Sequence, residues 1–404
     1  MSKKIPLGIT IALVLISIFV STVASIFIFL NLYDDLLLEL PQRASQYEKL
    51  ADIDELVRRE YFGEINGESI DKSLATGYLS GLQDKYCYYI YPEDYSAYEH
   101  MIQGVMPGIG ISAYYDAETG YLKTSYIYSD SPAEDSGITE NSYILSVNGK
   151  NVTEDNAESL LSEIADEYNK KIKLEYITSV SEQNISEVTL TSGYQQNSCT
   201  YRIDGPVGYI KLSSFYENTS QIFADAINYF SENSISAMIL DVRNCSGINY
   251  DAAAELIDMI VPVGSEGTGA IYSAKNSADE LVKQVSSDAA SINMTIAVLI
   301  NSRTESAAEL VACDLRDFGK AILIGEKTAG NGTMQQLFKL DDGGAVSLTV
   351  AKIIPYISGS FDEIGVTPDR EIITSESFKN SLDTAEDFSD DEQYQNAYSY
   401  LSGK

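Results

Sequence analysis

The chain has 404 residues, 44% of them hydrophobic, and a formal net charge of −33. This length predicts two to three domains with a sizeable core. The negative charge argues against nucleic acid as a partner, because phosphates need a basic surface. The single histidine and the unclustered cysteines predict no zinc site, and we expect no cofactor. We interpret the cysteines as small buried thiols, with a disulfide outside the cytoplasm left open; they are Cys87, Cys199, Cys245 and Cys313.

An apolar segment runs from Ile5 to Leu32, directly after Lys3 and Lys4. It is long enough to span a bilayer as a helix, and the two lysines predict a cytoplasmic N-terminus. A cleaved signal peptide is the alternative, but the segment is longer than an ordinary signal sequence. We therefore expect a single-pass anchor over residues 1–32, with the bulk of the chain extracytoplasmic.

Residues 33–103 have a helical pattern. Leu50, Ile53 and Leu56 recur at helical spacing. A glycine-containing segment, residues 63–67, interrupts this helix, and a second helix is predicted from Ile70 to Leu82. We expect an N-terminal helical cap.

Glycine-containing segments characterise the next region, residues 104–180. Successive N–H groups of such a loop can form a nest for a carboxylate, and an exposed strand edge can pair with a peptide. The segments GIGI, SPAEDSGI and ILSVNGK, which begin at residues 108, 131 and 144, resemble those of bacterial PDZ domains. The resemblance implies that a protein C-terminus binds to the first segment, formed by Gly108, Ile109, Gly110 and Ile111.

After a polar linker or strand, residues 181–200, alternating strands and helices are predicted. Gly205 to Leu212 opens this part, a helix covers Ser220 to Ser231, and a buried strand covers Ala237 to Val242. The last strand leads into the segment DVRNCSGI, residues 241–248. From these residues alone, that segment is a strand-to-helix turn.

A strand–helix–strand unit follows. The strands are Ile296–Ile300 and Ala321–Gly325, and the helix begins near Ser306. A serine at a helix N-terminus lies at the positive end of the helix dipole, where the N–H of Ala307 lacks an intrahelical partner. This favours negative charge on oxygen, as in acyl transfer. The alternative is structural, because Ser306 and Glu309 match the S-x-x-E capping box.

This unit and the loop after it resemble the core of the carboxyl-terminal processing peptidases, the tail-specific serine proteases of family S41. The resemblance implies that Ser306 is the nucleophile and that Asp317, at the end of the helix, orients the site. Eleven residues at about 100° each bring these two onto nearly one helix face. The family's general base is a lysine in a Gly-Lys-Gly loop, which here is Gly330-Asn331-Gly332. Asn331 therefore replaces the base, and an asparagine cannot take the serine proton.

Other bases are less well placed in the sequence. Lys327 lies four residues upstream of Asn331, where the family often has a second lysine, and Lys320 is predicted on the solvated end of the helix. Some relatives use a histidine, but His100 lies where the family does not place one.

The segment at residues 241–248 resembles the family's Asp-Leu-Arg-Asn-Asn-Pro-Gly-Gly loop. The resemblance implies an oxyanion hole formed by the N–H groups of Gly247 and Ala307. Ser246 and Ile248 replace the family's proline and second glycine, so the turn is less permissive. Further matches are Gly365-Val366-Thr367-Pro368-Asp369 and the terminal helix near residues 391–398.

Together these patterns predict a multidomain α+β and α/β protein with a protease core of the ClpP/crotonase-like βαβ type. The predicted segments are a transmembrane anchor (1–32), a helical region (33–103), a PDZ domain (104–180), an S41 core (181–375) and an acidic helical tail (376–404). The predicted function is a serine endopeptidase that cleaves unstructured C-terminal tails of extracytoplasmic proteins. The alternative is a pseudoprotease that binds peptide C-termini without cutting them. A homo-oligomer is left open.

Overall fold

The computed structural model describes residues 17, 19–23, 44–181, 184–261, 270–287, 291–382 and 388–403. It forms two compact units, Met1–Leu74 and Ala75–Lys404. A helix covers residues 44–60 of the first unit. None of the described helices combines the length and the apolar character needed to cross a bilayer. Most of the predicted anchor lies outside the described residues, so the anchor stays a prediction.

The second predicted helix is confirmed with slightly earlier bounds, as α2 (Gly67–Ser80). A short strand, β1 (Tyr88–Ile90), and helix α3 (Pro92–Ile102) follow it. Pro92 occupies the first turn of α3, where its missing N–H costs no hydrogen bond.

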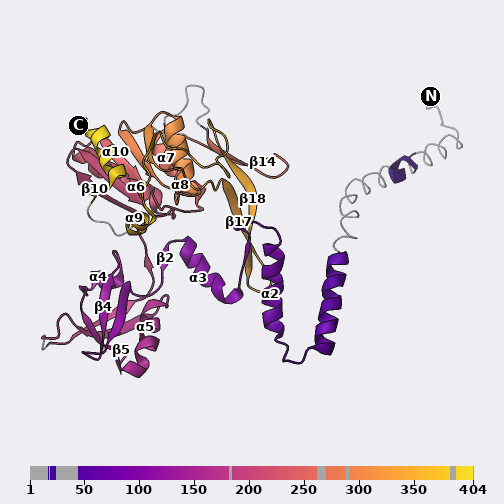
Figure 1. Ribbon diagram of the computed structural model, residues 1–404, viewed down its shortest axis with the longest axis horizontal. Helices are drawn as coiled ribbons and strands as arrows, with labels where there is room; N and C mark the ends of the chain where they lie inside the picture. The colour runs from indigo at the N-terminus through magenta and orange to yellow at the C-terminus, as the bar shows by residue number, and fades with distance from the viewer. Residues whose placement is uncertain are drawn as a thin grey trace, which may run out of the picture. The chain divides into compact units, whose positions relative to one another are not determined.

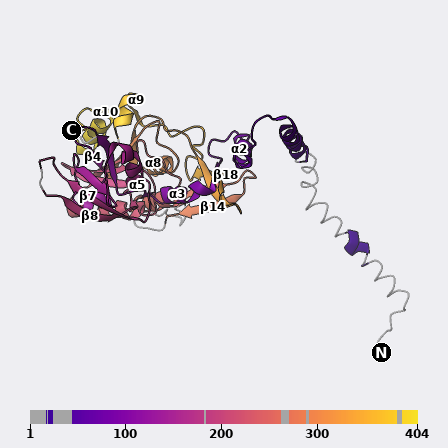
Figure 2. The same ribbon diagram turned by 90° about the horizontal axis from the view of Figure 1, so that it is seen from below.

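An antiparallel sheet with its own core occupies the region of the predicted PDZ domain (Figure 1). Its strands are β3 (Ile111–Asp116), β4 (Tyr121–Ile127), β5 (Tyr143–Val147), β6 (Lys150–Asn151), β7 (Lys171–Ile177) and β8 (Ser186–Thr191). Strands β7 and β8 lie side by side in Figure 2, so the sheet continues past the predicted boundary at residue 180. Its helices are α4 (Pro132–Asp135), a 3₁₀ turn at Glu154–Asn156, and α5 (Ala157–Ala165). The two-stranded pair β2 (Val105–Met106) and β9 (Tyr194–Gln195) lies where the chain enters and leaves this region.

The second unit also contains a six-stranded sheet in the order β10-β11-β12-β15-β16-β19. All neighbours are parallel except β10 and β11. The strands are β10 (Cys199–Asp204), β11 (Val207–Leu212), β12 (Ala237–Asp241), β15 (Thr295–Ile300), β16 (Ala321–Gly325) and β19 (Arg370–Glu371). Every residue of β12 is buried, as expected for a parallel strand covered on both faces.

Helices cover both faces of this sheet (Figure 1). One face packs on α6 (Thr219–Glu232), α7 (Tyr250–Ile260) and α8 (Ala307–Asp317). The other face packs on α10 (Glu392–Ser402), which follows the short α9 (Glu376–Ser381). The segment predicted as an acidic tail therefore contains a layer of the core.

A five-stranded antiparallel sheet lies against the α7 and α8 layer. Besides β1 it contains β13 (Ala270–Lys275), β14 (Leu281–Ser286), β17 (Thr333–Lys339) and β18 (Ala345–Pro355). Strand β18 is central and pairs with β1, β13 and β17.

The parallel strands β12 and β15 are adjacent and in register, with Leu240 opposite Val298. Their carboxyl ends therefore meet at one edge of the sheet. The loops that leave this edge carry Gly247 and Ser306, so the topology brings these two predicted residues together.

Candidate active site

Ser306 has a strained backbone at the N-terminus of α8. Its φ of 61° and ψ of −117° fall in a region that L-residues rarely adopt and that glycine tolerates, as at the first central position of a type II′ turn. The residue is only 1% exposed. Such an outlier persists only where its surroundings enforce it, and outliers of this kind cluster at functional sites.

The Ser306 hydroxyl has a specific partner that the sequence did not reveal. Ser306 Oγ donates to Tyr250 Oη over 3.0 Å. Tyr250 Oη lies 3.2 to 3.3 Å from the carbonyl oxygens of Thr333 and Asn331, to which it donates. Burial raises the pKa of Tyr250, the hydrogen bond from Ser306 opposes the shift, and the charge of Glu309 adds to it. Tyr250 is therefore a neutral phenol at neutral pH, which can accept a hydrogen bond from Ser306 but is a poor proton acceptor.

The predicted oxyanion hole is not formed in this conformation. The Ala307 N–H donates to the carbonyl oxygen of Gly247 over 3.1 Å, so Gly247 presents a carbonyl to Ala307. The two preceding carbonyls also accept hydrogen bonds, that of Cys245 from the Glu305 N–H at 3.0 Å and that of Ser246 from Ser214 Oγ at 3.1 Å. Of the two predicted donors, the Ala307 N–H is therefore occupied in this state by the carbonyl of the other donor residue, Gly247.

Only glycine fits at position 247. A Cβ atom there would lie 2.9 Å from the backbone nitrogen of Phe215, which is too close for a real contact. The neighbouring Ile248 side chain is half-exposed.

Glu309 is a buried organiser of the loop that contains Asn331. Its carboxylate accepts the N–H groups of Ser306 (3.0 Å), Gly330 (2.7 Å) and Asn331 (2.8 Å), and the Thr328 hydroxyl (2.5 Å). Burial raises the pKa of Glu309, and these donors offset only part of that shift. The capping box in the sequence pointed to the Ser306 contact and missed the other three.

Asn331 lies at the site but its side chain is committed elsewhere. It is 3% exposed, and its Oδ1 accepts the Thr333 hydroxyl at 2.8 Å. This arrangement positions the β17 end of the loop and supplies no base to Ser306.

A pocket of about 370 Å³ contains Ser306, Asn331 and Gly247. Apolar and aromatic side chains dominate its lining: Tyr86, Tyr88, Tyr98, Met101, Ile102, Phe215, Tyr216 and Ile248. Among the described residues that line it, Glu305 is the only carboxylate, and none is a lysine or histidine. Glu305 accepts a 2.5 Å hydrogen bond from Tyr86 Oη.

Neither Asp317, which was predicted to orient the site, nor the lysines and the histidine that were set aside as bases line this pocket. Asp317 lies at the opposite end of α8, about 16 Å along the axis for 11 residues. The two residues share a helix face, but the prediction ignored the rise along the axis. Lys327 is exposed, and Lys320 contacts Ser291. The ring of His100 stacks on Tyr168 at 4.1 Å.

The predicted peptide-binding loop, Gly108 to Ile111, uses two of its N–H groups internally. The N–H of Gly108 donates to Glu167 O at 2.8 Å, and that of Ile109 donates to Ile164 O at 3.2 Å. These acceptors lie at the end of α5, whose last carbonyls lack intrahelical partners. Neither N–H group is free for a terminal carboxylate in this state. Strand β3, which begins at Ile111, is an edge strand of its sheet.

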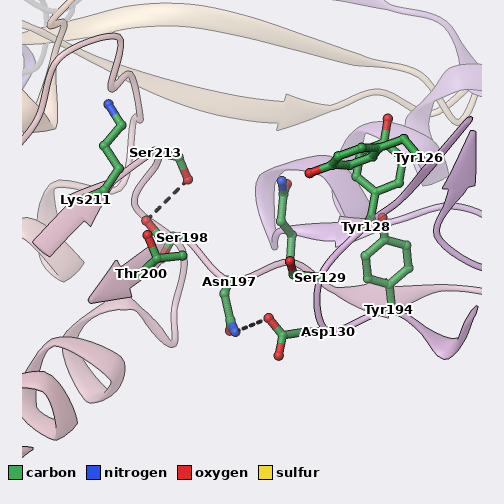
Figure 3. A pocket seen from close by; sticks show the side chains of 11 residues that line it. Tyr126, Tyr128, Ser129, Asp130, Tyr194, Asn197, Ser198, Thr200, Lys211 and Ser213 are labelled. Carbon is green, nitrogen blue, oxygen red and sulfur yellow. Dashed lines mark hydrogen bonds between the residues drawn. The ribbon is translucent and has the colours of Figure 1, made fainter. Parts of the chain in front are cut away.

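A second pocket, of about 250 Å³, contains none of the residues that the sequence singled out. Figure 3 shows its tyrosines, Tyr126, Tyr128 and Tyr194, opposite Lys211 and Ser213. The polar groups between them pair with each other, Asn197 with Asp130 and Ser213 with the carbonyl of Ser198. This pocket is separate from the Ser306 site.

Part of the chain matches a known protein family, and two curated relatives align with most of the chain. Residues 206–372 match the model of peptidase family S41. A carboxyl-terminal-processing protease of Synechocystis is 29% identical over 343 residues, which cover 83% of this chain and 76% of the relative. The carboxy-terminal processing protease CtpA of Bacillus subtilis is 28% identical over 316 residues, covering 76% of this chain and 65% of the relative.

A solved structure supports the fold. A Bacteroides fragilis protein assigned provisionally to the S41 proteases aligns with a TM-score of 0.50 at 18% identity. The alignment covers 85% of this chain and 91% of that one.

The βαβ core places Ser306, with its strained backbone, at the N-terminus of α8 beside the pocket. The resemblance to the S41 proteases that we read from the sequence is confirmed over residues 206–372, and the chain is similar to carboxyl-terminal processing proteases.

Proposed function

We propose that the protein is a serine endopeptidase in which Ser306 is the nucleophile. The strained backbone of Ser306 is the observation that carries the proposal. A serine that only capped the helix would adopt an ordinary extended backbone. The strain instead turns the side chain into the pocket, where the Ser306 hydroxyl is held by Tyr250.

The pocket supports an apolar substrate side chain next to the scissile bond. Its lining is rich in tyrosine and aliphatic groups, which favour burial of apolar surface. We propose unstructured, apolar C-terminal tails of proteins as the substrate class, with the region of residues 104–191 as a PDZ-type binding module. We also propose an extracytoplasmic location with residues 5–32 as the membrane anchor.

In this proposal catalysis needs a local rearrangement. The peptide bond after Gly247 must turn so that its carbonyl leaves the Ala307 N–H. That N–H is then free to stabilise the oxyanion of an attacked carbonyl. A substrate carbonyl that replaces the Gly247 carbonyl would make the same hydrogen bond, so the cost of this exchange is small.

A second candidate is a peptide-binding protein without catalysis, and Asn331 favours it. The proton of Ser306 must leave during attack, and asparagine cannot take it. General-base assistance commonly contributes about 10²–10⁴ in rate, so its loss leaves at most slow cleavage unless Glu305 accepts the proton.

A labelling and cleavage experiment separates the two candidates. The full chain is incubated with a fluorophosphonate, which reacts with activated serines, and with an unfolded protein that ends in apolar residues. The variants are Ser306→Ala, Asn331→Lys and Glu305→Gln. Ser302→Ala is the matched control, since Ser302 lies in the same loop and contacts Lys379.

Labelling and cleavage that vanish in Ser306→Ala but persist in Ser302→Ala would establish the peptidase. If Glu305→Gln is also silent, Glu305 is the base. Silence of the wild-type protein together with activity of Asn331→Lys would establish a binding protein with an intact nucleophile. Cleavage that survives in Ser306→Ala would refute the proposal.

A further inference from the structure

A cluster of metal-ligand side chains lies at the C-terminal end of α8, opposite Ser306. The Sγ atom of Cys313 and carboxylate oxygens of Asp314 and Asp317 all lie within 4.8 Å of one another. Cys313 and Asp314 are buried, and the Asp317 side chain is almost so. The three groups therefore converge on a small enclosed space.

Asp314 supplies an independent observation. It is 0% exposed, and within the described part of the chain neither of its carboxylate oxygens has a hydrogen-bond partner. Buried polar groups in proteins are nearly always hydrogen-bonded. A buried carboxylate without a partner is strongly unfavourable unless a cation or proton compensates it. The cluster thus points to an absent positive group.

The local electrostatics favour a cation further. The C-terminal end of a helix carries partial negative charge from its free carbonyls, so two aspartates there add to an already negative potential. Arg316 offsets part of it, with Nη2 at 3.4 Å from Asp317 Oδ1 and 4.0 Å from Cys313 Sγ. Its other terminal nitrogen donates to the carbonyl of Thr367 at 3.0 Å.

We propose that Cys313, Asp314 and Asp317 bind a divalent zinc ion. One thiolate and two carboxylates suit a borderline-soft metal, and Zn²⁺ takes sulfur and oxygen ligands in fourfold coordination with a water as the fourth ligand. Binding releases the Cys313 thiol proton to solvent. Three anionic ligands and a dication then leave one net negative charge, which Arg316 offsets.

The role of this site is structural. Asp317 also accepts the backbone N–H of Ser358 at 3.0 Å, and Arg316 holds Thr367. Asp317 therefore joins the proposed site to the contact that holds the end of α8 against the segment between β18 and β19. In this proposal Asp317 is a metal ligand at the far end of α8, and it does not orient Ser306 as the sequence resemblance implied.

The test uses the untagged full chain after dialysis against a chelator. Zinc is titrated calorimetrically, and Co²⁺ is added separately because a thiolate ligand gives an intense near-ultraviolet charge-transfer band. The variants are Cys313→Ser and Asp314→Asn. Cys199→Ala is the control, because Cys199 is an equally buried free thiol in β10.

The wild-type protein and Cys199→Ala should bind one zinc per chain. Cys313→Ser should lose the cobalt band, and Asp314→Asn should bind zinc at least about tenfold more weakly, since loss of even an outer-shell partner costs about 10–100-fold. If either variant fails to fold, as judged by circular dichroism, Asp317→Asn at the less buried position replaces it. Absence of stoichiometric zinc in the wild-type protein overturns the proposal. So does unchanged affinity in a folded ligand variant.

Discussion

The strain at Ser306 makes a quantitative prediction about two substitutions at that position. Ser306→Ala and Ser306→Gly both remove the hydroxyl that donates to Tyr250. They differ in the backbone, because alanine keeps the Cβ that disfavours φ of 61° and ψ of −117°, whereas glycine tolerates these angles.

The magnitude follows from two opposing terms. A residue held in a sparsely populated region costs about 1–3 kcal/mol, which glycine relieves. Glycine also gives the unfolded chain more conformational entropy, which costs about 0.4–1 kcal/mol. We therefore expect Ser306→Gly to exceed Ser306→Ala in free energy of unfolding by about 1 kcal/mol.

Native-state hydrogen exchange of the α8 amides is the appropriate assay, since it reports the local stability of this helix in a chain of several domains. Ala308→Gly is the control, because residue 308 lies inside α8 and glycine there should destabilise by about 1 kcal/mol. Ala308→Gly is compared with the wild-type protein, and Ser306→Gly is compared with Ser306→Ala. An equal loss of protection in the two comparisons would refute the strain at Ser306.

Three further predictions concern buried polar groups. Glu309→Gln should lower the unfolding free energy by about 2 kcal/mol, because the amide nitrogen would face N–H donors; thermal unfolding measures this, and an unchanged midpoint would contradict it. Tyr250→Phe should cost about 1 kcal/mol in the same assay, whereas Tyr272→Phe should cost less because its hydrogen bond is longer, 3.4 Å. Asp241→Asn should cost about 1.5–3 kcal/mol at pH 7, because it removes one of the two carboxylates that pair with the buried Arg243, while Asp391 still pairs with it at 2.7 Å. Burial opposes ionisation of Asp241, but Arg243 outweighs it and holds the pKa of that carboxyl below 3.8, so the deficit of the variant should shrink as the pH falls below about 4. A deficit that stays constant down to pH 2 would contradict this assignment.

Much of the core was predictable because its signals are local. The strands flanking α8 are short apolar runs, and their observed bounds, Thr295–Ile300 and Ala321–Gly325, are within a residue of those predicted. The meeting of Gly247 and Ser306 also follows from parallel topology. The state of the site was not predictable, because it depends on the direction of the Gly247 carbonyl. That direction is set by a tertiary contact with the N–H of Ala307, a residue 60 positions away. No sequence pattern marks that contact.

Tyr250 shows a second kind of limit. The sequence around Tyr250 indicates only the start of a helix. Its hydroxyl contacts Ser306 because the N-terminal ends of α7 and α8, which belong to separate βα units, lie next to each other. The sequence could indicate at most that a buried tyrosine needs a hydrogen-bond partner; it could not indicate which residue that partner is.

The departure from the family pattern at Asn331 is physically coupled to Ser306. Tyr250 links Ser306 to the carbonyl of Asn331, and Glu309 holds the N–H of the same residue. Restoring a lysine at position 331 would place an ammonium in a loop whose backbone is fixed at both ends, while the serine proton still points at Tyr250. The lysine can act as a base only if Ser306 releases that contact. Activity that appears in Asn331→Lys combined with Tyr250→Phe, but not in Asn331→Lys alone, would identify the tyrosine as the block, whereas equal activity would show that the missing base is the whole defect.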